Sequence, residues 1–151
     1  MEKITKKLAA WSLLLVMVCM TWGCDKKWPI NGNLDGYWQL MTVETKANGT
    51  KTDCHRMYMG IQLHMVELTD LGGNGYKSFF GEFSYDEDQD IVIIKNLKGK
   101  NATSDDGQLA AIPDLNPYGI NAQETVFKVV KADGKALILE SDYARLTLRS
   151  F

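Results

Sequence analysis

The sequence predicts an all-β protein, an antiparallel up-and-down β-barrel of seven or eight strands preceded by an N-terminal signal helix. Residues 56–68 alternate apolar and polar side chains, which is the period of a half-buried strand. Turn-forming residues separate short apolar stretches along the chain, and Asp133-Gly134 is a strong hairpin signal. The 151 residues, 45% of them hydrophobic and 24% charged, suit one domain. Closure into a barrel leaves no edge strand with unpaired backbone groups, which in an open sheet could pair with another chain.

The N-terminus has the pattern of a secretory signal peptide. Lysines at positions 3, 6 and 7 precede an apolar run over residues 8–20, which is shorter than the roughly 20 residues that cross a membrane. Gly23 and Cys24 end this segment, and no good Ala-x-Ala site competes with them. The ending resembles the lipobox of bacterial lipoproteins, in which the Cys is lipidated and begins the mature chain. We therefore expect a lipoprotein signal peptide over residues 1–23 and a lipid on Cys24; cleavage without a lipid, or an uncleaved anchor, is the alternative.

Removal of residues 1–23 changes the charge and the cysteine count of the chain. Three lysines and Glu2 leave with the signal peptide, so the formal net charge falls from −2 to −4. A mildly acidic domain has no electrostatic reason to bind nucleic acid. With Cys19 removed and Cys24 acylated, Cys54 has no partner for an internal disulfide, whereas a free Cys24 would leave a Cys24–Cys54 bridge as the single candidate.

The rest of the chain divides into a tether and a barrel domain. Residues 24–34, with Pro29 and Asn31-Gly32 as breakers, predict the tether, and residues 35–151 predict the barrel. The seven expected strands are residues 36–45, 56–68, 76–85, 90–96, 125–131, 135–140 and 143–151. Part of residues 97–103 is the best candidate for an eighth strand. One or two helical turns within residues 108–115, limited by Pro113, and a compact segment at 116–120 predict a cap between the fourth and fifth of these strands.

The first expected strand opens with Gly36-Tyr37-Trp38. This matches the G-x-W pattern of lipocalins and other calycins, and with the lipobox the chain resembles small lipocalin-like lipoproteins of Bacteroides-type bacteria. The resemblance implies a lipocalin-like barrel in which Trp38 closes one end. It also implies that a basic residue of the last strand, Arg149 or failing it Arg145, packs across Trp38 in a cation–π contact. Most of that family has no assigned activity, so the resemblance implies a fold more than a function.

Residues able to carry catalysis or bind a metal are few. Cys54 and His55 are neighbours and point to opposite faces of a strand, and His64 lies about 33 Å further along an extended chain. The acidic turn over residues 86–90 has calcium-loop spacing, but it lacks the Gly and Glu of an EF-hand, which leaves a weak hairpin-tip calcium site as the alternative to a solvated turn. We therefore expect no catalytic residue, no metal site and no cofactor.

Methionines and aromatic residues gather on the expected inner faces of the strands. Soft Met side chains beside aromatic rings can line a cavity for an apolar ligand, or they can simply fill the barrel. The candidate lining residues are Met41, Met59, Ile61, Leu63, Met65, Phe79, Phe83 and Phe127.

These features predict a membrane-anchored, non-enzymatic binding lipoprotein for a small apolar or amphipathic ligand. The alternative is a protein-interaction or inhibitor module of the bacterial envelope that acts through loops such as residues 72–75 and 98–107. The expected partners are the membrane, through the lipid on Cys24, and either the ligand or an envelope protein. Asp25-Lys26-Lys27 is unlike the acidic run of surface-export signals, so we expect the periplasmic side of the outer membrane, with surface exposure as the alternative.

Overall fold

The computed structural model describes residues 29–102 and 104–151, and the signal peptide and Cys24 lie outside this part of the chain. No helix among the described residues is long and apolar enough to cross a membrane. The elements in chain order are η1 (Gly32–Leu34), β1 (Gly36–Thr45), β2 (Thr50–Gln62), β3 (Met65–Asp70), β4 (Phe79–Asp86), β5 (Ile91–Lys100), β6 (Asp105–Leu109), α2 (Ile112–Leu115), η2 (Asn116–Tyr118), β7 (Glu124–Ala132), β8 (Ala136–Glu140) and β9 (Ala144–Ser150).

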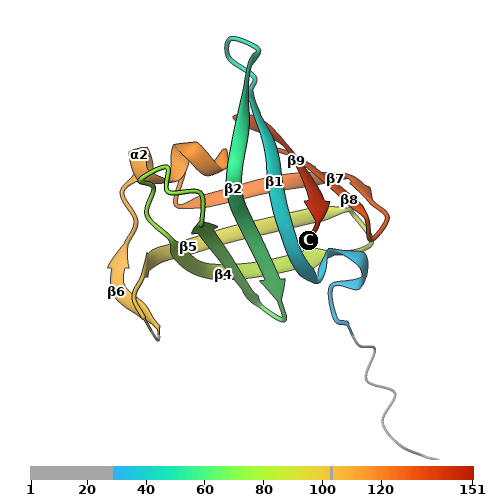
Figure 1. The fold of residues 1–151 in the computed structure, drawn as a ribbon. Helices are drawn as coiled ribbons and strands as arrows, with labels where there is room; N and C mark the ends of the chain where they lie inside the picture. Colours follow the sequence, from blue (N-terminus) through green and yellow to red (C-terminus); the bar gives the residue numbers. More distant parts are fainter. Residues whose placement is uncertain (1–28, 103) are drawn as a thin grey trace, which may run out of the picture.

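Eight of these strands form a closed antiparallel barrel (Figure 1). The order of the strands around the ring is β1, β2, β3, β4, β5, β7, β8 and β9, and β9 pairs with β1 to close it. β6 lies outside the ring and pairs with the end of β5. The predicted up-and-down barrel with a short helical cap is therefore confirmed.

The eighth strand arises where the sequence predicted one long strand. Residues 56–68 contain the end of β2, a two-residue turn at Leu63-His64 and the start of β3. No Gly, Pro or Asn marks this turn, and Leu63 adopts a positive φ of 57°. The expectation of an eighth strand within residues 97–103 was wrong, because β5 continues to Lys100.

The barrel interior is one continuous apolar core. Inward-facing side chains from all eight ring strands form a single buried cluster, which includes Trp38, Leu40, Met57, Met59, Val66, Phe79, Phe83, Ile94, Phe127, Leu139 and Leu146. Strand alternation produces this core, since every second residue of a strand points inward except where an irregularity such as the one at Met41 in β1 shifts the pattern. The outward residues are mostly half-buried or exposed.

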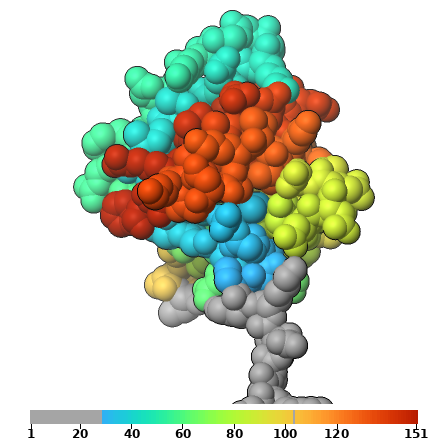
Figure 2. Space-filling view, turned by 90° about the vertical axis from the view of Figure 1, so that its right-hand side faces the viewer, coloured from blue at the N-terminus to red at the C-terminus, as the bar shows by residue number. Residues whose placement is uncertain are grey.

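One end of the barrel is closed by the segment that precedes β1. Leu34 is 1% exposed, and its carbonyl oxygen accepts a 2.9 Å hydrogen bond from the indole Nε1 of Trp38. Figure 2 shows this blue segment wedged beneath β7–β9 and beside the yellow-green β4–β5 turn. The last residues of the expected tether, Asn31 to Leu34, therefore pack as part of the barrel.

The segment between β6 and β7 fills the other end as a plug (Figure 1). Leu115, Tyr118 and Ile120 have no exposed surface. The Tyr118 ring packs edge-on against Phe79 at 6.2 Å, and its hydroxyl donates a 2.8 Å hydrogen bond to the carbonyl oxygen of Lys77. Gly119 has a φ of 76°, and a Cβ there would lie 2.2 Å from Leu146, so this position requires glycine.

The predicted Asp-Gly turn joins β7 to β8 and makes a pH-sensitive contribution to stability. Hydrogen bonds from the backbone N–H groups of Ala136 and Lys135 lower the pKa of Asp133 to about 2. A carboxylate with a lowered folded-state pKa stabilises the fold above its unfolded pKa of about 4 and loses that contribution as the pH falls through about 2. We expect Asp133→Asn to lower the urea midpoint at pH 6 and to match the unmodified protein below about pH 2. A difference that persists at that pH would contradict this origin.

Candidate functional site

The predicted cavity-lining residues separate into two groups. Five of them lie inside the barrel, each at most 2% exposed and in the shared core: Met59, Ile61, Phe79, Phe83 and Phe127. Together with the plug and Trp38 they fill the space that would hold a ligand. Of the two interpretations of these side chains, the structure favours the filled barrel.

The other three residues do not face the interior. Leu63 and Met65 are 41% and 54% exposed. The two-residue turn pairs Gln62 with Met65, so alternation changes parity there and Met65 joins the outward side. Met41 is half-buried at an irregularity in β1, between the inward-facing Leu40 and Val43. Their prediction as interior lining was wrong for these reasons.

Trp38 and Arg149, the residues of the expected barrel-closing signature, lie on opposite sides of the barrel wall. Trp38 is 2% exposed at the closed end, and Gly36 before it has a φ of 144°. Arg149 lies on the outer face of β9, where its Nε and Nη2 donate hydrogen bonds of 2.9 and 2.7 Å to Oε1 of Gln39. The expected contact with Trp38 is therefore wrong for Arg149. Leu146 and Leu148 occupy the inward positions of β9, and Arg145, on the same outward side, pairs with Glu140.

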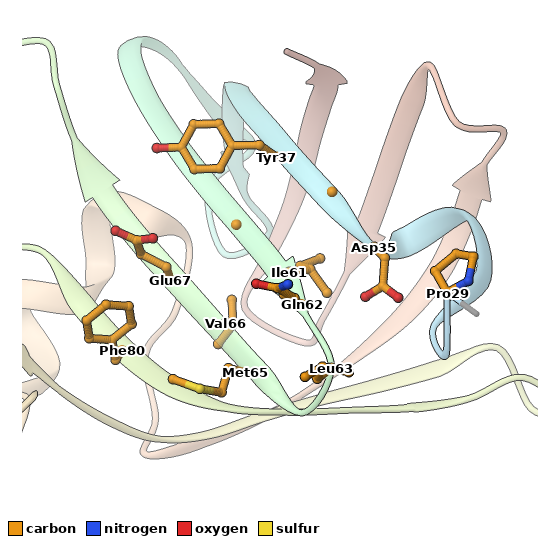
Figure 3. A pocket seen from close by; sticks show the side chains of 12 residues that line it. Pro29, Asp35, Tyr37, Ile61, Gln62, Leu63, Met65, Val66, Glu67 and Phe80 are labelled. Atoms are coloured by element: carbon orange, nitrogen blue, oxygen red, sulfur yellow. The ribbon is translucent and has the colours of Figure 1, made fainter. Parts of the chain in front are cut away.

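A groove of about 540 Å³ lies on the outer wall of the barrel, across β1 to β4 (Figure 3). One end of it is a row of four outward residues that face one another across the strands: Tyr37 pairs with Gly60, Gly60 with Glu67, and Glu67 with Phe80. Gly60 has no side chain, and one edge of the Tyr37 ring lies close to its backbone. The groove therefore has an aromatic ring at each side and a carboxylate between them.

Neighbouring aromatic rings fix the position of the Tyr37 ring. Its ring stacks on Tyr58, with centroids 5.2 Å apart and planes 11° apart, and Phe151 meets both rings edge-on. A Cβ at Gly60 would lie 3.1 Å from the Tyr37 ring, so glycine allows the ring to lie close to β2. Burial, and next the charge of Glu67, raise the pKa of Tyr37 above the ordinary value of a tyrosine.

The carboxylate of the row is paired. Glu67 forms an ion pair with Lys100 and accepts a 2.9 Å hydrogen bond from the hydroxyl of Thr69. Nζ of Lys100 also lies 5.3 Å from the centroid of the Phe80 ring. This end of the groove thus offers hydrogen-bond donors and acceptors with their charges balanced.

The opposite end of the groove, next to the β2–β3 turn, is apolar. Leu63, Met65 and Pro29 lie there, as Figure 3 shows, and the buried Ile61 and Val66 also line the groove. Asp35 is the carboxylate on this side, and it accepts hydrogen bonds from the backbone N–H and the side-chain amide of Asn31, at 3.2 and 2.6 Å.

The reactive residues considered from sequence form no site in the described part of the chain. No group of three or more His, Cys, Asp or Glu there could hold a metal ion. Burial raises the pKa of Cys54 to about 11, so its sulfur is a thiol rather than a nucleophilic thiolate at neutral pH.

Sequence reasoning missed the groove because its residues come from four strands. Tyr37, Gly60, Glu67 and Phe80 are far apart in sequence, and their row depends on the register of β2 against β3. This register is set by the turn at Leu63, which has a positive φ although it is neither glycine nor asparagine, the residues that usually mark such a turn in a sequence. The alternation of apolar and polar residues in their strands does predict that Tyr37 and Gly60 face outward.

Comparisons with known proteins agree with this architecture. Residues 16–151 match a family model described as a lipocalin-like domain. A crystal structure of a lipocalin-like protein from Bacteroides uniformis is 23% identical, covers 80% of this chain and all of its own, and has a TM-score of 0.57. A crystal structure of an uncharacterized protein from Bacteroides eggerthii is 20% identical, covers 78% of this chain and 98% of its own, and has a TM-score of 0.58. No curated protein matches the chain. Since the family model spans most of the sequence, the chain belongs to the family of lipocalin-like domains.

Proposed function

We propose that this protein is a membrane-tethered, non-enzymatic binding lipoprotein that holds a small amphipathic ligand in the groove on its outer wall. The observation that carries the proposal is the contrast between a filled interior and a concave outer site of about 540 Å³. That volume lies within the roughly 300–1,000 Å³ typical of small-molecule sites. Apolar walls with a few polar groups also suit such a ligand.

The chemistry of the groove supports binding rather than catalysis. Glu67 is engaged by Lys100 and Thr69, and Asp35 by Asn31. The Thr69 hydroxyl that is hydrogen-bonded to Glu67 is only 6% exposed and does not line the groove, so it is not placed to attack a bound ligand as an activated nucleophile would be. We therefore assign these groups to recognition.

A lipid on Cys24 would place the groove near the membrane. Residues 24–28 reach at most about 18 Å when fully extended, and the next residue, Pro29, lines the groove. We propose that this tether fixes the protein to the periplasmic side of the outer membrane, in reach of amphipathic molecules at the bilayer surface. Protease treatment of intact cells distinguishes this location from the cell surface, where the barrel would be cleaved.

Cys24→Ala is expected to abolish the anchor. Cells fed an alkyne-labelled fatty acid should yield labelled protein in the membrane fraction, and the Cys24→Ala variant should carry no label and leave that fraction. Cys54→Ala is the matched control and should keep both the label and the location. Equal labelling of the Cys24→Ala variant would exclude acylation at this residue.

Obstruction of the groove tests the binding site itself. We expect Nile red, a neutral apolar dye, to bind the chain from Asp25 onward, which contains the whole barrel, with an increase in fluorescence. Gln62→Trp places a large side chain at the edge of the groove and should weaken dye binding about tenfold or more, because the ring occupies the space that the dye needs. Gln108→Trp, at an exposed position on β6, should leave it unchanged. Equal binding by both variants would show that the dye binds elsewhere.

A second candidate function is protein interaction through the β1–β2 hairpin. This hairpin projects beyond the barrel (Figure 1), and most of the residues from Lys46 to Arg56 are exposed. A photo-crosslinking residue at Lys51 should then capture one stoichiometric envelope protein, whereas the same residue at Lys128, on the outer face of β7, should not. Equal capture at both positions would argue against this function.

A further inference from the structure

We infer that the ligand of the groove is a sugar-headed amphiphile, with an uncharged sugar ring on Tyr37 and an alkyl chain along Leu63 and Met65. This inference rests on the proposed function and adds the class of ligand. It follows from the division of the groove into an aromatic, hydrogen-bonding end and an apolar end (Figure 3).

The ring site is built from the row of Tyr37, Gly60, Glu67 and Phe80. A pyranose ring has an apolar C–H face and a rim of hydroxyl groups, and the apolar face can lie against an aromatic ring. Tyr37 offers such a ring in a fixed position, because Tyr58 stacks on one of its faces and one edge of the ring lies close against Gly60. Glu67 is the cross-strand neighbour of Gly60, so its carboxylate lies within the same row to accept hydrogen bonds from the hydroxyl rim.

The charges at this end favour a neutral head group. Glu67 and Lys100 form an ion pair, so the row carries both an acceptor and a donor with no excess charge. Hydroxyl groups both donate and accept, and they suit this pair. A phosphate at this end would meet the carboxylate of Glu67, and a quaternary ammonium would be repelled by Lys100, which lies beside both Glu67 and Phe80.

The chain site begins where the row ends. From Gly60 to Leu63, the first residue of the turn after β2, the chain spans at most about 10 Å, three residues at about 3.3 Å each, which is about the length of an extended octyl chain. Met65 is 54% exposed and Leu63 41%, so an alkyl chain there would cover apolar surface that now faces water. The flexible thioether of Met65 adapts to chains of different shape.

The test measures binding of octyl β-D-glucoside, octyl β-D-galactoside and octyl α-D-mannoside below their micelle concentrations. In NMR spectra of the chain from Asp25 onward, at least one of them should shift both the backbone amide signal of Gly60 and the methyl signal of Met65. Octyl tetraethylene glycol, which has the same chain without a ring, should bind about tenfold more weakly, since it lacks one aromatic contact and one or two hydrogen bonds. The methyl glycosides should shift Gly60 alone.

Two variants separate the two halves of the site. Tyr37→Leu should weaken the octyl glycoside about fivefold and so reduce its advantage over octyl tetraethylene glycol from about tenfold to about twofold, while Tyr37→Phe should keep most of that advantage. Met65→Ser should weaken the octyl compounds about three- to fivefold and leave the methyl glycosides unchanged. Leu109→Ser, at an exposed position on β6 with 55% exposure, is the matched control and should change neither.

The inference and the proposed function can fail separately. If octyl phosphocholine or octyltrimethylammonium binds as tightly as the best octyl glycoside, the sugar head group is wrong, although the groove still binds amphiphiles. The same conclusion holds if octyl tetraethylene glycol matches the glycosides. If no octyl compound binds and Gln62→Trp leaves Nile red binding unchanged, the groove is not a ligand site and both proposals fail.

Discussion

Replacement of Tyr118 by alanine is expected to lower the free energy of unfolding by about 3–5 kcal/mol, because it removes a fully buried ring from the end of the barrel and leaves a cavity. The ring is packed against Phe79, and the hydroxyl donates a hydrogen bond to Lys77. Urea unfolding of the variant and the unmodified protein measures the difference. Tyr118→Phe keeps the ring and should lower the free energy by only about 0.5–1.5 kcal/mol.

The same variant tests whether the barrel is filled. Apolar cavities made by truncation stay dry and bind small apolar molecules, so benzene should raise the melting temperature of the Tyr118→Ala protein. Benzene should leave the melting temperature of the unmodified protein and of Tyr118→Phe unchanged. A similar rise in the unmodified protein would show an interior open to ligands, and the binding site would then have to be sought inside the barrel.

Replacement of Trp38 by alanine is expected to lower the free energy of unfolding by about 3–5 kcal/mol at the opposite end. Trp38 is 2% exposed, and its indole N–H holds the carbonyl of Leu34, so the variant loses both core packing and the contact that fixes the N-terminal segment. Amide hydrogen exchange over residues 31–36 should rise together with the loss of stability. Trp38→Phe should lose less, because most of the apolar volume remains.

Arg149→Ala is the companion measurement. Its guanidinium binds Gln39 on the outer face, and exposed polar contacts of this kind contribute little, so the expected change is within about 0.5 kcal/mol. A loss of unfolding free energy as large as that of Trp38→Ala would show that Arg149 does help to close this end of the barrel.

The parts of the fold that the sequence predicted are those with local signals. Residues Gly36–Thr45 were predicted with the observed bounds, because turn residues flank an apolar stretch on both sides. The Asp133-Gly134 turn and the plug around Pro113 and Tyr118 also carry their signals in adjacent residues. β6 was not predicted, because five exposed residues with two aspartates and a glycine have no strand pattern of their own.

The parts that were missed depend on contacts between strands. Leu63-His64 is a turn that its own residues do not favour, so its position is decided by the packing of β2 and β3 on the core. That one turn determines the side to which Met65 and Glu67 point, and hence the composition of the groove. Arg149 was misplaced for a related reason: the family pattern identified a basic residue near the last strand, whereas strand alternation decides its face.

The pairing of β1 with β9 also governs the order in which the molecule can fold. Leu40 pairs with Leu148 and Val43 with Leu146, so the seam joins residues more than a hundred positions apart. Contacts of such long sequence separation slow folding, because the loop between them must close first. A partly folded chain can form the local hairpins from β2 to β5, but it cannot complete the ring until residues 144–150 have joined β1. Until then it presents two open edges, one on β1 and one on the last strand that has paired.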